Sequence, residues 1–267
     1  MLPPDLIILM YHHVAEPPRG SPASGAPLRG LYVTPRQFTW QIDWLRHAGA
    51  RFCSFAALPG AEAALAGPWV MLTFDDGYRD VYEHAWPVLR GRGIPAVVYP
   101  VVGDIGKSAV VWPESTDRTP ADVLTEAQVR EMSQGGIEFG SHLWDHVHAE
   151  RLALPELRQQ LTESREGLAR IAGSVPLSVA YPFGSYTPQV GQEAARAGYR
   201  YGVTTLAGSN RGAPPLELRR IAVKGTRLHH RWVFARALRR AIAAVNARAS
   251  RQSAAEASAP ARTEERG

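Results

Sequence analysis

Short apolar runs of strand length recur along the chain and alternate with segments in which apolar residues lie three or four positions apart. Runs of four to eight apolar residues between turn residues are typical of buried strands, and the wider spacing is typical of helices with one buried face. Strands are therefore predicted at residues 6–10, 69–74, 96–102, 137–140, 177–181, 199–204 and 218–223. Helices are predicted at residues 35–48, 81–90, 125–134, 155–171 and 188–197.

This order of elements predicts a single barrel. Strands that alternate with helices pair in parallel through right-handed crossovers. About seven such units favour a barrel over two domains, because one (β/α) barrel typically needs roughly 250 residues. We therefore assign residues 1–228 to one α/β barrel domain and residues 229–246 to a basic C-terminal helix. Residues 247–267 contain no large apolar residue and are expected to form a disordered tail.

Composition limits the class of protein. With 267 residues, 45% of them hydrophobic, the chain can bury a full core. No run approaches the roughly 20 apolar residues that a membrane-spanning helix needs, and the N-terminal segment lacks the basic start of a signal peptide. A cytoplasmic protein, with membrane association through a peripheral contact only, is therefore expected. The single cysteine, Cys53, excludes an intrachain disulfide and a cysteine-based metal cage.

The positive charge is confined to one segment. Ten of the thirty Lys and Arg residues, and none of the twenty-five Asp and Glu residues, lie between Leu218 and Ala255, so the rest of the chain is net acidic. This argues against a nucleic-acid-binding body. Within 229–246 an apolar stripe runs from Phe234 to Val245, with arginines beside it. Either the stripe packs on the barrel with its arginines in solvent, which we favour, or the segment contacts an anionic membrane.

Four clusters of residues that could take part in catalysis or metal binding follow predicted strands. The carboxyl ends of the strands are where a barrel places its catalytic groups. The first is Thr73-Phe-Asp-Asp-Gly77. Taken alone it is better explained as a solvated turn. Two adjacent carboxylates directly after a buried strand are costly, however, unless a cation or proton occupies the site. Because neighbours on a strand point to opposite sides, Asp75 and Asp76 can serve different roles.

The second cluster contains His142 and His146, within Ser141-His-Leu-Trp-Asp-His146. Two His four residues apart meet on one side if the segment turns helically, and that spacing suits a divalent metal. Taken alone, such a pair is usually two surface histidines that share no ligand. Joined to the Asp pair, it predicts a site of two His and one carboxylate with open positions for water.

The remaining two clusters are weaker. The segment Ala180-Tyr-Pro-Phe-Gly184 is predicted to be the end of a strand followed by a Pro-containing turn. Met10-Tyr-His-His13 ends the first strand, where its imidazoles are either packing residues or a source of an acid.

Taken together, the clusters resemble the polysaccharide deacetylases of carbohydrate esterase family 4, the NodB-homology fold. TFDDG, then H-x3-H, then Y-P-F-G follow the order of that family's first three motifs, and the N-terminal L-M-Y-H is similar to the branch of the poly-N-acetylglucosamine deacetylases. The resemblance covers roughly residues 5 to 225. It implies a distorted (β/α)7 barrel of the TIM type and metal-dependent removal of N-acetyl groups from a glycan.

The resemblance also implies roles for individual residues. Asp76, His142 and His146 match the ligands of one divalent metal; zinc is the default for this ligand set, although cobalt, nickel or iron would fit. Asp75 matches the general base and His12 the general acid. The backbone N–H of Phe183 matches the donor to the oxyanion.

This sequence departs from the family pattern at two positions. Ala180 stands where an Arg commonly orients the catalytic Asp, and Leu143 stands where a Ser or Thr commonly follows the first His. The sequence therefore shows no residue at the family's usual position that would orient Asp75. Arg220 and Lys224, on or after the last predicted strand, are candidate replacement cations, and Tyr181 is a further candidate for a supporting role.

Three functions compete. The leading hypothesis is a metal-dependent N-deacetylase acting on an N-acetylated sugar or polysaccharide. An amidase or deacylase acting on a small non-sugar amide is the second. An inactive carbohydrate-binding protein is the third, and the five intact residues that match the metal site, base and acid argue against it. Aromatic residues near these motifs suit stacking on sugar rings as well as ordinary packing. They are Tyr11, Trp112, Trp144, Tyr181 and Phe183.

Overall fold

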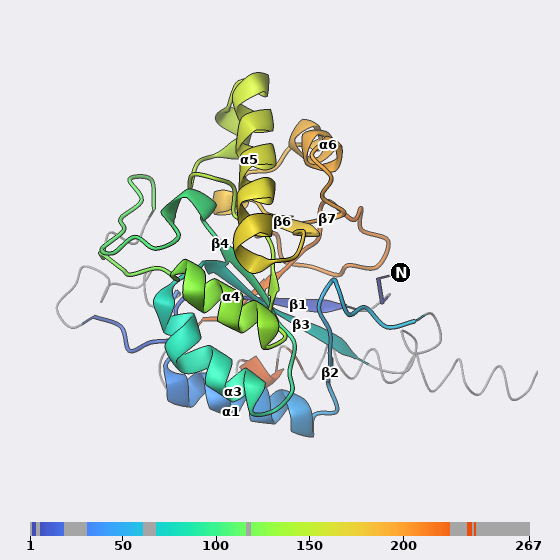
Figure 1. The fold of residues 1–267 in the computed structure, drawn as a ribbon. Helices are drawn as coiled ribbons and strands as arrows, with labels where there is room; N and C mark the ends of the chain where they lie inside the picture. The colour runs from blue at the N-terminus through green and yellow to red at the C-terminus, as the bar shows by residue number, and fades with distance from the viewer. Residues whose placement is uncertain are drawn as a thin grey trace, which may run out of the picture.

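The computed structural model describes residues 2–3, 6–18, 31–60, 68–115, 119–224, 234–236 and 238. Within these residues the chain forms eight short strands and a set of helices that surround them (Figure 1). The strands are β1 (Ile7–Tyr11), β2 (Arg51–Phe52), β3 (Trp69–Asp76), β4 (Val97–Pro100), β5 (Glu138–Phe139), β6 (Ser178–Ala180), β7 (Tyr201–Val203) and β8 (Ile221–Ala222).

Five α-helices connect the strands. They are α1 (Pro35–His47), α3 (Trp86–Arg90), α4 (Glu126–Gln134), α5 (Leu154–Ala172) and α6 (Pro188–Arg196). Short turns of other helical types adjoin them: η3 (Val81–Ala85), η4 (Val102–Asp104), η5 (Ala149–Arg151) and η6 (Pro182–Gly184). Figure 1 shows α5 and α6 beside β6 and β7, with α1, α3 and α4 grouped on the other side of the strands.

The strands close into a distorted barrel. The main sheet has the order β5-β4-β3-β1-β8, and β6 pairs with β7 separately; all of these pairings are parallel. Single bridges between Ser141 and Val179 and between Val203 and Leu218 join the two sheets at both ends. The seven strands β1 and β3–β8 therefore complete a ring, in which two of the junctions are single-residue bridges. The predicted (β/α)7 barrel is confirmed.

The alternation of side chains along each strand separates two cores. Ile7, Leu9 and Tyr11 of β1 belong to the large cluster between the strands and the helices, whereas Ile8 belongs to the cluster inside the barrel. Along β3 the residues 70, 72 and 74 are likewise in the outer cluster, and Met71 is in the inner one. Since the period of a strand is two, Thr73 and Asp75 are directed to the same side as Met71. A carboxylate is thus placed inside the barrel.

The predicted elements were found with small shifts at their ends. Thr125 and Gln128 form the expected capping box at the start of α4. Two features were not predicted. β2 has only two residues, too few for a periodic signal, and the helix predicted at 81–90 begins with the π-helical turn η3 before α3.

The part of the basic segment that the structure describes packs against the barrel. The ring of Phe234 lies 6.2 Å from that of Trp40 and 5.8 Å from that of Trp44, both on α1, and Leu238 is 1% exposed. This is the contact expected if the apolar stripe packs on the protein. Most of the segment, including Arg239 and Arg240, lies outside the described residues, as does the tail 247–267.

Among the described helices, none combines the length and the apolar composition that crossing a bilayer requires. The expected compartment remains a prediction, as does the membrane contact of the basic segment.

Packing of the basic segment predicts a loss of stability on truncation of its buried residue. We expect Leu238→Ala to lower the free energy of unfolding by about 2–5 kcal/mol, because it removes buried methyl groups and leaves a cavity. Leu206→Ala is the matched control, since Leu206 is 52% exposed and surface substitutions usually change stability by less than about 0.5 kcal/mol. Urea unfolding measures both. Equal effects of the two substitutions would contradict the packing.

Candidate active site

The four polar clusters lie at one end of the barrel. β1 leads into His12, β3 ends at Asp76, β5 leads into Ser141 and His142, and β6 leads into the turn 182–184. Because these strands are parallel and neighbouring, their carboxyl ends face the same rim. The arrangement brings together residues that are up to about 170 positions apart in the sequence, as expected for a barrel of this size.

The turn after β3 explains the Asp-Asp-Gly sequence. Asp76 has a φ of +71° and Gly77 a φ of +73°, so the strand ends in two consecutive residues of left-handed conformation. Asp tolerates this conformation better than most residues. At Gly77 a side chain is also excluded by space, because a Cβ would lie 2.7 Å from Cβ of Pro100. The turn aims Asp75 and Asp76 at different partners.

Asp75 forms a bidentate ion pair with Arg220. The two guanidinium NH₂ groups donate to Oδ1 and Oδ2 of Asp75 at 2.6 Å each. Arg220 directly precedes β8 and its side chain is fully buried, while that of Asp75 is 3% exposed. Two of the other three N–H donors of the guanidinium are used as well: Nε donates to the carbonyl of Thr204 at 2.9 Å and one NH₂ also donates to Oγ1 of Thr73 at 3.1 Å.

This pair fixes the charge of Asp75. Burial raises the pKa of the Asp75 carboxyl, but the charge and the hydrogen bonds of Arg220 outweigh this effect, and the net pKa is lowered. Asp75 is therefore ionised at neutral pH, and its orientation is set by a planar fork. Of the two candidate cations, Arg220 makes this contact. Lys224 is exposed, and no ion pair joins it to Asp75.

Asp76 faces the two histidines instead. Its Oδ1 lies 3.3 Å from Nε2 of His142 and 3.4 Å from Nε2 of His146, and all three side chains are at least nine-tenths buried. The hydrogen bonds to both histidines outweigh the effect of burial and hold the pKa of Asp76 well below its usual range. The three groups are the one cluster of potential metal ligands among the described residues.

The donor set and its spacing fit a divalent metal. Ligand atoms about 2.0–2.1 Å from a tetrahedral zinc ion are about 3.3 Å from one another, close to the observed separations of 3.3 and 3.4 Å. His142 Nδ1 donates to the carbonyl of Ala180 at 2.7 Å, so Nε2 is the ring nitrogen that faces the shared centre. Nδ1 of His146 is buried and has no partner among the described residues.

The segment between the two histidines is not helical. None of residues 141–148 is helical: Ser141 forms a β-bridge, residues 144–146 form bends, and Leu143 adopts a φ of +64°. The helical turn on which the sequence argument depended is therefore absent. The histidines meet because the left-handed residue reverses the chain, and because Leu143, fully buried, packs in the cluster under α5 and α6.

His12 and His13 lie in different surroundings. His13 is stacked between Tyr32 and Tyr78 at ring distances of 4.1 and 3.5 Å, and its Nδ1 is 2.5 Å from Oδ2 of Asp80. His12 is partly exposed. Burial lowers its pKa, while the nearby charges of Asp76 and Asp75 raise it, and the net shift is downward.

Phe183 and Tyr181 also differ in what they contact. Phe183 has a φ of +60° and its ring stacks on His148 at 4.1 Å and against His146 at 4.5 Å. Its N–H donates to no described protein acceptor, whereas the next two N–H groups along the chain bond within the turn. Tyr181 is buried, and its hydroxyl donates to the carbonyl of Leu216 rather than to a group of the site.

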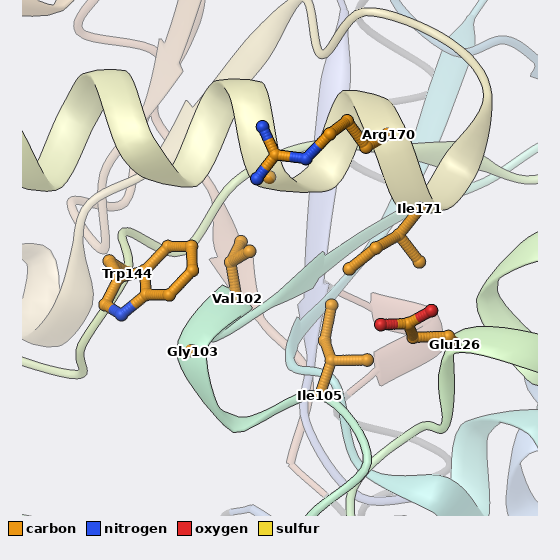
Figure 2. Close-up of a pocket in the computed structure, with 8 residues that line it drawn as sticks. Val102, Gly103, Ile105, Glu126, Trp144, Arg170 and Ile171 are labelled. Atoms are coloured by element: carbon orange, nitrogen blue, oxygen red, sulfur yellow. The ribbon is translucent and has the colours of Figure 1, made fainter.

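An aromatic wall flanks the metal-ligand cluster. The ring of Trp112 lies 4.7 Å from that of His146, which also contacts Phe183, and Nε1 of Trp112 donates to Asp104 at 2.8 Å. Tyr11 belongs to the outer core, where its hydroxyl bonds to Gln41. Trp144 faces a separate cavity of about 380 Å³ between η4, α4 and α5, which none of the three ligand residues lines (Figure 2).

Several residues in or beside the site were given no role by the sequence argument. Thr73 could have been found, because it is two positions before Asp75 and so shares its side of β3. Asp80, which pairs with His13, and Glu114, which lies 3.1 Å from Nε2 of His148, follow no motif or spacing. Only the folded chain brings them to the site.

Comparisons with known proteins identify similar sequences and folds. A family model described as polysaccharide deacetylase matches residues 63–202, more than half of the chain. The Bacillus subtilis protein YxkH, which bears a polysaccharide deacetylase name, is 30% identical over 215 residues, covering 78% of this chain and 67% of that protein. The poly-β-1,6-N-acetyl-D-glucosamine N-deacetylase of Staphylococcus aureus is 24% identical over 67% of this chain and 63% of its own length.

Solved structures resemble the fold. The Streptococcus pyogenes deacetylase PplD, solved in complex with acetate, superposes with a TM-score of 0.67 at 28% identity, covering 81% of this chain and 91% of that one. IcaB from Ammonifex degensii has a TM-score of 0.65 at 24% identity, over 86% and 95% of the two chains. These structures share the fold; the family model and the match to YxkH establish that the chain belongs to the polysaccharide deacetylase family.

Proposed function

We propose that this protein is a metal-dependent hydrolase that removes N-acetyl groups from an N-acetylated glycan. One observation carries the proposal: two adjacent buried carboxylates have separate partners, Asp75 the guanidinium of Arg220 and Asp76 the imidazoles of His142 and His146. One carboxylate is thus available as an oriented base, and the other as part of a metal-ligand set. A binding protein needs neither.

Asp76, His142 and His146 would hold the ion. When bound, a divalent ion polarises a carbonyl group and makes water a usable nucleophile near neutral pH. We propose zinc because two imidazoles and one carboxylate suit it best, with cobalt, nickel and iron as ions that the same ligands accept.

The neighbouring residues supply the proton transfers. Asp75, kept ionised by Arg220, accepts the proton of the attacking water. The N–H of Phe183 donates to the oxygen on which charge develops as the acetyl carbon becomes tetrahedral. His12 in its imidazolium form then protonates the departing amine, a role to which His13, stacked between two tyrosines and paired with Asp80, has no access.

For the substrate we propose a polymer containing N-acetylglucosamine. The support is the family to which the chain belongs and the substrate in the name of the S. aureus relative. The rings of Trp112 and Phe183 beside His146 provide apolar faces of the kind that sugar rings pack against. These faces would also accept a small non-sugar amide, so substrate choice has to be measured.

The first test measures release of acetate. With zinc present we expect the protein to release acetate from an oligomer of N-acetylglucosamine, and to lose that activity after treatment with a chelator. Asp76→Asn is expected to be inactive, because the amide removes a charged ligand. Faster release from a small non-sugar acetamide than from the oligomer would favour the amidase alternative. No release from either, by a folded and zinc-loaded protein, would refute the hydrolase.

Removal of the cation beside Asp75 should move the pH dependence of activity. In Arg220→Met the burial of Asp75 acts without its counter-charge, so the Asp75 pKa rises and the acid limb of kcat/KM shifts to higher pH. Because the pair is buried, its loss should also destabilise the protein by about 3–5 kcal/mol. Lys224→Met is the control and should leave the profile unchanged. An unshifted limb in a folded Arg220→Met protein would exclude Asp75 as the base.

The proposed acid can be tested separately from the metal. We expect His12→Gln to lower kcat by roughly 10²–10⁴-fold, because the amine would leave without a proton, while zinc binding stays intact. Metal content by atomic absorption and kcat by acetate release measure the two effects. An active His12→Gln enzyme beside a folded but inactive His13→Gln enzyme would reverse the assignment.

A further inference from the structure

One side chain outside the predicted site holds the segment between the two histidines. Oε1 of Gln160 accepts hydrogen bonds from two consecutive backbone N–H groups, those of Trp144 at 3.1 Å and Asp145 at 2.8 Å. Its Nε2 donates to Oδ2 of Asp145 at 2.7 Å. Gln160 lies on α5, fourteen residues after His146, so a helix of the outer layer fixes the loop that carries the metal ligands.

The two histidines differ in how their rings are held. Nδ1 of His142 bonds to the carbonyl of Ala180 at 2.7 Å, which fixes that ring directly. Nδ1 of His146 has no hydrogen-bond partner among the described residues. Trp112 and Phe183 flank the ring of His146 but give Nδ1 no acceptor. The position of His146 therefore depends on the backbone before it. The N–H groups of Val102 and Gly103 hold the carbonyls of residues 143 and 144, and Gln160 holds the N–H groups of residues 144 and 145, nearest to His146.

A second contact with the same helix supports this arrangement. The indole of Trp144 lies between η4 and α5, beside Val102 and Arg170 (Figure 2). It approaches α5 so closely that a Cβ at Gly167 would be 3.0 Å from Cζ3 of the indole. The loop is thus anchored to α5 by an apolar contact at Trp144 and by the amide of Gln160 at the peptide groups that lead to His146.

We propose that Gln160 is a positioning residue for the metal site, which sets the place of His146 by clamping the backbone of residues 144 and 145. The inference rests on the proposed metal-dependent function, because it assigns Gln160 a role in metal affinity. It predicts that Gln160 influences binding of the ion although it touches none of the three ligands.

The test measures zinc affinity rather than activity alone. We expect Gln160→Ala to raise the dissociation constant for zinc by roughly 10–100-fold, the range found when groups that orient metal ligands are removed. Titration calorimetry on chelator-treated protein gives this constant. The matched control is Gln159→Ala, because Gln159 is exposed and bonds one turn along α5 to Glu163, and its zinc affinity should equal that of the unaltered protein.

A charge rearrangement separates positioning from general destabilisation. Gln160→Glu keeps an acceptor for the two N–H groups but sets a second carboxylate against Asp145, so we expect weaker zinc binding. Adding Asp145→Asn restores a donor and an acceptor in the reversed order and should recover most of the lost affinity. A merely structural role would lower the Tm of the metal-free protein, but zinc affinity would not fall in Gln160→Glu and recover in the double variant. The double variant also keeps the proposal testable if Gln160→Ala does not fold.

The outcomes distinguish this inference from the proposed function. If the unaltered protein binds no divalent ion, the proposed function fails and the role of Gln160 falls with it. If the unaltered protein binds zinc and the folded Gln160→Ala protein binds it equally well, Gln160 has no positioning role and the proposed function stands. Weaker binding by Gln160→Glu that Asp145→Asn does not relieve would also overturn the inference.

Discussion

The arrangement of the site at this end of the barrel depends on how the charges of two adjacent, buried carboxylates are balanced. Asp75 and Asp76 are 2% and 6% exposed, and an isolated carboxylate in such surroundings would take up a proton or unfold the region. Arg220 neutralises Asp75 through a bidentate ion pair, and two of the three remaining N–H donors of the guanidinium are also hydrogen-bonded. Asp76 faces the imidazoles of His142 and His146 instead. Because imidazoles bind a metal in their neutral form, a divalent cation at this cluster would be what balances the charge of Asp76.

Closure of the barrel is what makes this division of charge possible. Arg220 reaches Asp75 because β8 pairs with β1, and β1 pairs with β3, so residues 145 positions apart lie across one interior. The alternation of β3 then sends Thr73 and Asp75 inward, while the left-handed turn at Asp76 and Gly77 redirects the second carboxylate toward the histidines. The same closure places β6 beside the loop after β5, where the carbonyl of Ala180 orients His142.

The sequence was most informative where a signal is local. Apolar runs predicted all seven strands of the ring, and a Thr with a Gln three residues later predicted the cap of α4, because both patterns depend on neighbouring residues alone. It also named Arg220 as a candidate partner of Asp75, but without a reason to prefer it to Lys224. That choice depends on burial and on strand order, which are tertiary. The bends between His142 and His146 and the clamp by Gln160 were not foreseen, since backbone hydrogen bonds from a distant glutamine leave no motif.

A crystal of the zinc-soaked protein, measured on both sides of the zinc absorption edge, tests the central claim most directly. The account predicts one anomalous peak about 2.0–2.2 Å from a ring nitrogen of His142, a ring nitrogen of His146 and an oxygen of Asp76, with Asp75 still paired to Arg220. A peak ligated by Asp75, or no peak near the three side chains while zinc is bound elsewhere, would contradict it.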